Sequence, residues 1–170
     1  RVHRPRRRAR LIHRRPMPRR LIIDGYSLLY RDDSLARLRP DNMRLAREQL
    51  IRKIDRLSDA LAPVVELVFD GRASSREHID TGHLQIIYSP GDKTADTVIE
   101  QMVHTDAAPA DVCVVTSDRL ECDTVSAAGA QVMSCISFLE WLDRLGREVV
   151  RHQKKSAPSR RFTLGDVFPE

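Results

Sequence analysis

The chain has 170 residues, enough for one domain with a single sizeable core. Its apolar fraction of 41% is ordinary, and no stretch approaches the roughly 18 consecutive apolar residues of a membrane-spanning helix. Three cysteines without CxxC spacing argue against a disulfide framework and a structural zinc site, and they favour a reducing, cytoplasmic compartment.

The net charge of +5 conceals a division along the chain. Residues 1–20 contain ten arginines and no acids, so the remaining 150 residues carry a net charge of −5. Residues 1–19 are predicted to be a disordered basic arm, and RNA is its natural partner because phosphate attraction requires only charge and reach. An organelle transit peptide and a solvated tail without a partner are the alternatives.

The first predicted elements are a strand and a long helix. A short apolar run at residues 20–23, ended by Asp24 and Gly25, predicts a buried strand. Apolar residues at three- and four-residue spacing over residues 42–61 then predict an amphipathic helix, which Pro63 ends.

Two more strands follow this helix. Apolar runs predict strands at residues 64–69 and 84–88. The intervening residues 71–82 are polar and contain little apolar material, so they are predicted to form a loop.

The second half of the chain alternates between helices and strands. Periodicity predicts helices at residues 94–104, 119–128 and 137–152, and strands at residues 112–115 and 131–133.

This alternation predicts a three-layer α/β sandwich with a mostly parallel central sheet. The folded domain is expected to span residues 20–152. A basic tail, residues 153–170, contains an apolar stretch at residues 162–168 that either docks on the body or serves as a partner motif.

Four aspartates recur at strand ends or at a helix start: Asp24, Asp70, Asp96 and Asp118. The carboxyl ends of parallel strands share one edge of a sheet, where open α/β folds build ligand sites. Each aspartate alone could merely cap a helix or form a turn. Together they would repel one another unless a hard cation such as Mg²⁺ or Mn²⁺ lay between them, which favours metal-assisted chemistry on a phosphate.

Four neighbouring side chains could assist such chemistry. Ser27 and Ser117 could hydrogen-bond a water or a phosphate, while Arg72 and Arg119 could neutralise charge on the phosphate. Plain surface solvation is the alternative for both arginines. A P-loop, a GxGxxG dinucleotide motif and an HExxH zinc motif are all absent from the sequence.

The order of these motifs resembles the NYN domain, and most closely its YacP-like branch. The resemblance covers roughly residues 20–146 and rests on four ordered segments, Leu21-Ile22-Ile23-Asp24-Gly25-Tyr26-Ser27-Leu28-Leu29, Phe69-Asp70-Gly71, Thr94-Ala95-Asp96 and Val114-Val115-Thr116-Ser117-Asp118-Arg119.

The resemblance implies a PIN-like fold, a divalent metal at an acidic rim, and endonucleolytic cleavage of RNA, with a link to ribosomes or translated mRNA. Carried over by motif, the four aspartates are the catalytic carboxylates, and Asp24, Asp96 and Asp118 are the metal ligands.

Ser27 departs from the family pattern, which usually has Asn at this position. Serine is shorter than asparagine, so contact with the substrate could be lost. A catalytically impaired RNA- or ribosome-binding module is therefore the alternative to an enzyme, and a small-molecule phosphatase, for which the basic arm has no evident role, is a third candidate.

Overall fold

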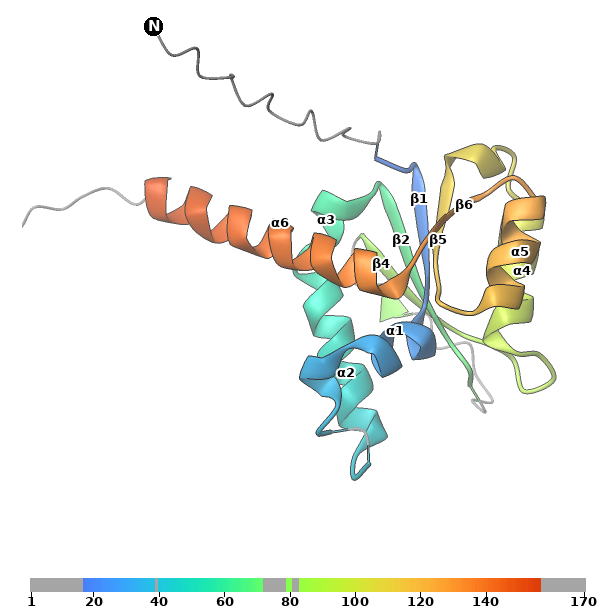
Figure 1. Cartoon of the computed structure of the whole chain (residues 1–170), viewed down its shortest axis with the longest axis horizontal. Coiled ribbons are helices and arrows are strands. Elements are labelled where there is room, and N and C mark those ends of the chain that lie inside the picture. Colours follow the sequence, from blue (N-terminus) through green and yellow to red (C-terminus); the bar gives the residue numbers. More distant parts are fainter. Residues whose placement is uncertain (1–16, 39, 72–78, 81–82, 157–170) are drawn as a thin grey trace, which may run out of the picture.

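The computed structural model describes residues 17–38, 40–71, 79–80 and 83–156. A six-stranded sheet with the order β3-β4-β2-β1-β5-β6 lies between two layers of helices (Figure 1). Five of the strands are parallel, and the short β3 pairs antiparallel with β4 at one edge. The strands are β1 Arg20–Asp24, β2 Val64–Phe69, β3 Ile79–Asp80, β4 Leu84–Tyr88, β5 Val112–Val115 and β6 Gln131–Met133.

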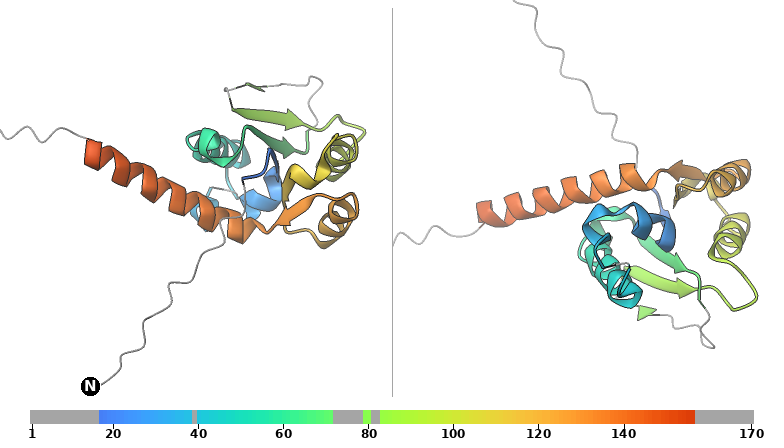
Figure 2. Two further views of the ribbon diagram at one scale, coloured as in Figure 1. Left: turned by 90° about the horizontal axis from the view of Figure 1, so that it is seen from above. Right: turned by 60° about the horizontal axis from the view of Figure 1, so that its bottom comes forward.

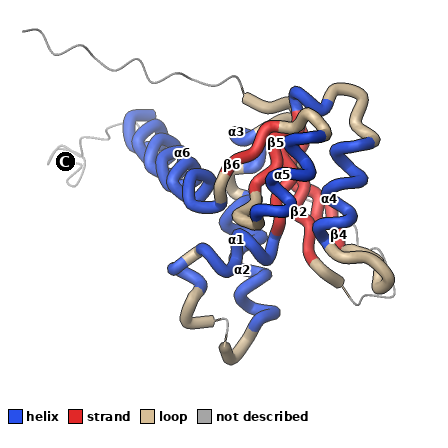
Figure 3. The backbone as a smooth tube through the Cα atoms, turned by 45° about the vertical axis from the view of Figure 1, so that its right-hand side comes forward, coloured by secondary structure: helices blue, strands red, loops and turns tan. Residues whose placement is uncertain are grey.

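The helices divide between the two faces of the sheet. One face carries α1, α2, α3 and α6, and the other carries α4 and α5, which lie side by side (Figures 2 and 3). Their bounds are α1 Gly25–Arg31, α2 Met43–Asp55, α3 Ser58–Leu61, α4 Ala95–His104, α5 Arg119–Ala127 and α6 Cys135–Ser156, with short 3₁₀ turns at Asp33–Leu35 and Pro109–Asp111.

Alternation along each strand produces two cores, one on each face of the sheet. In β1, Leu21 and Ile23 join the core beneath α1, α2, α3 and α6, whereas Ile22 joins the core beneath α4 and α5. Both faces are covered, so the central strands are apolar throughout, as buried parallel strands are. By the same alternation Asp24 is on the α4 and α5 side, because it is two residues beyond Ile22.

The five predicted strands are all present, and the predicted three-layer α/β class is confirmed. The single helix predicted over residues 42–61 is wrong, since α2 ends at Asp55 and the separate short α3 begins at Ser58. The hydroxyl of Ser58 donates to the carbonyl of Asp55 at 2.9 Å, which stabilises the break. The loop predicted over residues 71–82 contains β3, and its residues 72–78 and 81–82 lie outside the described residues.

Ion pairs connect β1 to its neighbours at the end of the sheet opposite the aspartates. The Arg20 guanidinium donates to Glu66 at 2.6 and 2.8 Å and to Asp106 at 2.9 Å. Arg19 also contacts Asp106, and its backbone N–H donates to the carbonyl of Asp111 at 3.0 Å. These contacts fix the start of β1.

Residues 1–16 of the predicted arm and residues 157–170 of the predicted tail lie outside the described residues. None of the described helices is long and apolar enough to cross a membrane.

Gly25 follows β1 at a point where no side chain fits. A Cβ atom at this position would lie 2.3 Å from Cε1 of Phe69, a fully buried ring that also packs against Tyr26 and Tyr88. We therefore expect Gly25→Ala to destabilise the fold by about 2 kcal/mol through overpacking, measured by urea denaturation. Gly91→Ala is the matched control, because a Cβ there meets nothing within 4 Å. An equal loss of stability in the two variants would contradict this explanation.

Candidate metal centre

Asp24 ends β1 and also caps the helix that follows it. Its Oδ1 accepts the backbone N–H groups of Tyr26 and Ser27, both at 3.1 Å. These hydrogen bonds satisfy donors that a helix N-terminus otherwise leaves open. The side chain of Asp24 is polar, yet the residue is only 6% exposed. The predicted capping role is therefore present, and it fixes the carboxylate at the carboxyl end of the central strand.

Asp118 has the same arrangement one strand away, after β5. Its Oδ1 accepts the N–H groups of Leu120 at 2.8 Å and Glu121 at 3.1 Å, so it caps α5. The side chain of Asp118 is exposed. Asp24 and Asp118 thus each cap a helix and also lie at the acidic edge of the sheet.

The sequence reasoning missed Glu121, which the structure places at the centre of the acidic edge. Asp118 and Glu121 have capping-box spacing, in which the glutamate normally turns back to the N-cap amide. Here the Asp118 N–H donates instead to Oγ1 of Thr116 at 3.1 Å. Glu121 is 2% exposed and Leu120 is 79% exposed, so the first turn of α5 has inverted polarity. In the sequence, the feature that could have pointed to Glu121 is the pair of Leu120 and Glu121 in the first turn of α5.

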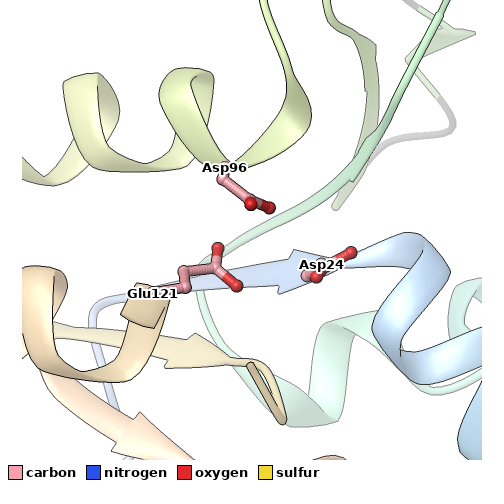
Figure 4. A group of neighbouring side chains, drawn as sticks. All are labelled: Asp24, Asp96 and Glu121. Carbon is pink, nitrogen blue, oxygen red and sulfur yellow. The ribbon is translucent and has the colours of Figure 1, made fainter. Parts of the chain in front are cut away.

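Three carboxylates from three elements converge at this edge. One oxygen each from Asp24 of β1, Asp96 of α4 and Glu121 of α5 lie within 4.8 Å of one another (Figure 4). Neither carboxylate oxygen of Glu121 meets hydrogen-bond geometry with any described residue. Unpartnered buried oxygens are costly, and a cation between these side chains would satisfy them.

Burial and repulsion from neighbouring acids make two members of the cluster, Glu121 and Asp96, hard to ionise. Burial first, and then the charges of Asp24, Asp96 and Asp118, raise the pKa of Glu121 from 4.5 to about 8, against the opposing effect of the Thr116 hydroxyl. The pKa of Asp96 is also raised, first by burial and then by Asp24, Asp118 and Asp70. All four predicted aspartates therefore contribute to the electrostatics of one site.

Asp70 holds the helix that supplies Asp96. Its Oδ1 accepts the backbone N–H of Ala95, the first residue of α4, at 2.6 Å. The Ser89 hydroxyl links the same region to β4, accepting the Gly71 N–H at 3.2 Å. Asp70 thereby fixes the start of α4 relative to β2.

The predicted assisting residues have different surroundings. Ser27 is half-buried in α1, next to the Asp24 carboxylate that its N–H contacts. The Ser117 hydroxyl accepts the N–H of Cys135 at 3.3 Å, which ties the end of β5 to the start of α6. Arg119 is the exposed first residue of α5, and Arg72 lies outside the described residues.

The arrangement fits a divalent cation. Carboxylate oxygens are the hard ligands that Mg²⁺ and Mn²⁺ prefer, and neither oxygen of Glu121 has a well-formed hydrogen bond from a described residue that would compete with a cation. The structure brings the predicted ligands Asp24 and Asp96 together with Glu121 as the third member. Asp118 lies close enough for its charge to raise the pKa of both Asp96 and Glu121, and its assignment as a ligand stays a prediction.

Comparison with known proteins agrees with this architecture. The family model of the YacP-like NYN domain matches residues 21–167. A Bacillus subtilis (strain 168) protein named "Uncharacterized protein YacP" is 26% identical over 138 residues, which cover 79% of this chain and 81% of that protein.

Two crystal structures of Rae1 (YacP) from Bacillus subtilis are also similar. A mutant form has a TM-score of 0.67 at 24% identity, covering 87% of this chain and 89% of that one. A second structure has a TM-score of 0.66 at 27% identity, covering 79% of each chain. Because the family match extends over most of the chain, the protein belongs to the YacP-like NYN domain family, which has a PIN-like nuclease fold.

Proposed function

We propose that the protein is a metal-dependent endoribonuclease that hydrolyses RNA phosphodiester bonds. The observation that carries this proposal is the convergence of Asp24, Asp96 and Glu121 at the carboxyl edge of the sheet. Two buried carboxylates beside a third, with both oxygens of Glu121 unpartnered among the described residues, are unfavourable for stability alone, and they suit a cation that acts on phosphate.

The chain's own residues provide the scaffold for this cation. Asp24, Asp96 and Glu121 would hold Mg²⁺ or Mn²⁺, which when bound would polarise a phosphoryl oxygen and lower the pKa of a water molecule. The amides of α1 orient Asp24, and the cap formed by Asp118 orients the backbone at Glu121. Since these contacts involve backbone groups, the Asp24 carboxylate and the backbone at Glu121 are positioned before substrate arrives.

RNA is the proposed substrate, in the cytoplasm and in the form of mRNA or ribosomal RNA, including RNA within the ribosome. Residues 21–170 carry a net charge of −5, so the body alone would repel RNA. Residues 1–19 and 153–170 are the proposed RNA-holding segments because they carry the basic excess. Arg119, Arg72, Ser117 and Ser27 are the proposed substrate contacts around the carboxylates.

Asp118→Asn tests this assignment most cleanly. Asparagine can keep the hydrogen bonds to Leu120 and Glu121, so the fold should persist while one negative charge beside the cation is lost. We expect Mn²⁺-dependent cleavage of a labelled RNA to fall about 10- to 100-fold. RNA binding in a gel-shift assay should be unchanged.

Asp123→Asn is the matched control, because it removes an exposed acid from the same helix. Full cleavage by Asp118→Asn would refute the role of Asp118. Absence of metal-dependent cleavage by the unmodified protein on every RNA tested would refute the endoribonuclease proposal itself.

A second candidate function is RNA or ribosome binding without cleavage, and Ser27 is the observation that favours it. Its N–H contacts Asp24, so the residue lies beside the cluster, where the family pattern has a longer amide side chain. If Ser27 limits an active enzyme, Ser27→Asn should increase cleavage with unchanged RNA affinity. Metal-independent RNA binding without metal-dependent product, in both the unmodified protein and Ser27→Asn, would establish the binding module instead.

A further inference from the structure

An open groove of about 1000 Å³ lies between the C-terminal end of α2 and the outer half of α6. Its apolar lining is aliphatic and its charged lining is mostly basic. The aliphatic residues are Leu57, Leu142, Val149 and Val150, and the charged ones are Lys53, Arg56, Arg147, Arg151 and Asp143. The groove is on the α2 and α6 side of the sheet, whereas the carboxylate cluster is on the α4 and α5 side.

The apolar stripe of α6 continues past the part that the body covers. Phe138 and Leu142 are buried against the core, and Leu145 packs against it. Val149 extends the same three- and four-residue spacing, but it is 39% exposed and its neighbour Val150 is 50% exposed. Figure 2 shows α6 projecting beyond the body over this outer half. An aliphatic helix face without a covering element is therefore present among the described residues.

We infer that residues 162–168 of this chain fold back and fill the groove. The segment reads Phe162-Thr163-Leu164-Gly165-Asp166-Val167-Phe168, so it offers four apolar side chains to the aliphatic floor and one acid to the basic rim. The family match continues to residue 167, well past Ser156 at the end of α6, so it includes all of this segment except its last residue.

The residues between α6 and this segment are numerous enough for the segment to fold back to the groove. Moving back from Ser156 to Val149 along α6 covers about 10 Å at 1.5 Å per residue. Residues 157–161 can span up to about 17 Å when extended. Phe162 can therefore reach the groove without any change in α6.

The lining of the groove suits this occupant better than RNA. Lys53 is already paired with Asp32 at 2.8 Å, and Nε of Arg56 donates to the carbonyl of Arg52 at 3.1 Å. Asp143 also lies in the lining, and none of the described lining residues has an aromatic ring on which a base could stack. An apolar peptide segment with an acid matches this chemistry.

Disulfide trapping in the full chain tests the position of the segment. In a Cys122→Ser background, Val150→Cys is combined with Leu164→Cys, and oxidation is followed by mass spectrometry of the monomer. The control pair replaces Val150→Cys with Glu148→Cys, an exposed position on α6 outside the groove lining. We expect the Val150 pair to form an intramolecular disulfide at least about tenfold faster than the control pair, because docking raises the effective concentration of the two thiols. Equal rates, or a disulfide found only between two chains, would overturn the inference.

Hydrogen exchange provides a second measurement that involves neither metal nor cleavage. The double change Phe162→Asp and Phe168→Asp should accelerate exchange of the α6 amides at residues 146–151, because charged side chains would not stay in an aliphatic groove. Ser159→Asp, which precedes the docking segment, should leave exchange unchanged. Unchanged exchange in the double variant, or protection of these amides by added RNA with no effect of the tail substitutions, would overturn the inference.

Discussion

Glu121→Gln should flatten the pH dependence of stability in the metal-free protein. The folded state raises the pKa of Glu121 from 4.5 to about 8, mainly through burial, so folding retains a proton that the unfolded chain releases. The resulting stability is fully present below pH 4.5 and is lost as the pH rises towards the folded pKa of about 8. The unmodified protein should therefore lose about 3 kcal/mol between about pH 5 and 8 through this group. Glutamine cannot ionise, so the variant should lack this loss.

Urea denaturation in the presence of a chelator, repeated across this pH range, measures the effect as the difference between the two proteins. Glu140→Gln, at an exposed glutamate of α6, is the matched control and should keep the slope of the unmodified protein. Mn²⁺ at about pH 8 should stabilise the unmodified protein more than Glu121→Gln, because ligand binding to the folded state adds stability. Identical pH slopes for the unmodified protein and Glu121→Gln would contradict the assigned environment of Glu121.

Asp24→Asn and Asp24→Ala should separate folding from catalysis. Asparagine can still accept the N–H groups of Tyr26 and Ser27, so Asp24→Asn should remain folded with stability close to normal. Asp24→Ala loses the helix cap and should lose about 1 kcal/mol of stability for that reason. Both variants remove a carboxylate from the cluster, so both should lose Mn²⁺-dependent RNA cleavage by about 100-fold or more.

The comparison depends on measuring stability, Mn²⁺ binding and cleavage on the same preparations. Calorimetric titration should show weakened Mn²⁺ binding in both Asp24 variants and unchanged binding in Asp123→Asn. If Asp24→Asn were active and Asp24→Ala inactive, cleavage would depend only on stability, and Asp24 would serve only as a helix cap.

The strands and the acidic edge were predictable because buried parallel strands leave a continuous apolar signature. The apolar runs at residues 64–69 and 112–115 are uninterrupted or nearly so; the first leads directly to Asp70, and the second leads to Asp118 after two residues. Topology then requires these aspartates to share an edge, whatever the details of packing. This reasoning placed Asp24, Asp70 and Asp118 at one edge, and the position of Asp96 at the start of a helix added it to the group.

The features that the sequence analysis missed depend on tertiary contacts, which the spacing of apolar residues does not reveal. Helix α1 follows β1 without any loop, and Asp24 belongs to the strand while it caps the helix. Glu121 looks like an ordinary capping-box acid, and only the diversion of the Asp118 N–H to Thr116 shows that its carboxylate is free to turn inward. Burial of an acid beside an exposed Leu120 contradicts the pattern that sequence reasoning uses.

The two capping aspartates have an evolutionary consequence. At Asp24 and Asp118 the backbone contacts need only an oxygen acceptor, whereas the proposed chemistry needs a negative charge. An aspartate codon becomes an asparagine codon by one nucleotide change, and that change would remove the charge while keeping the cap. On the proposed function, a lineage could therefore lose cleavage in a single step and still retain a folded body with its basic terminal segments, on which selection would continue to act. The same scaffold can in this way give rise to both enzymes and binding modules.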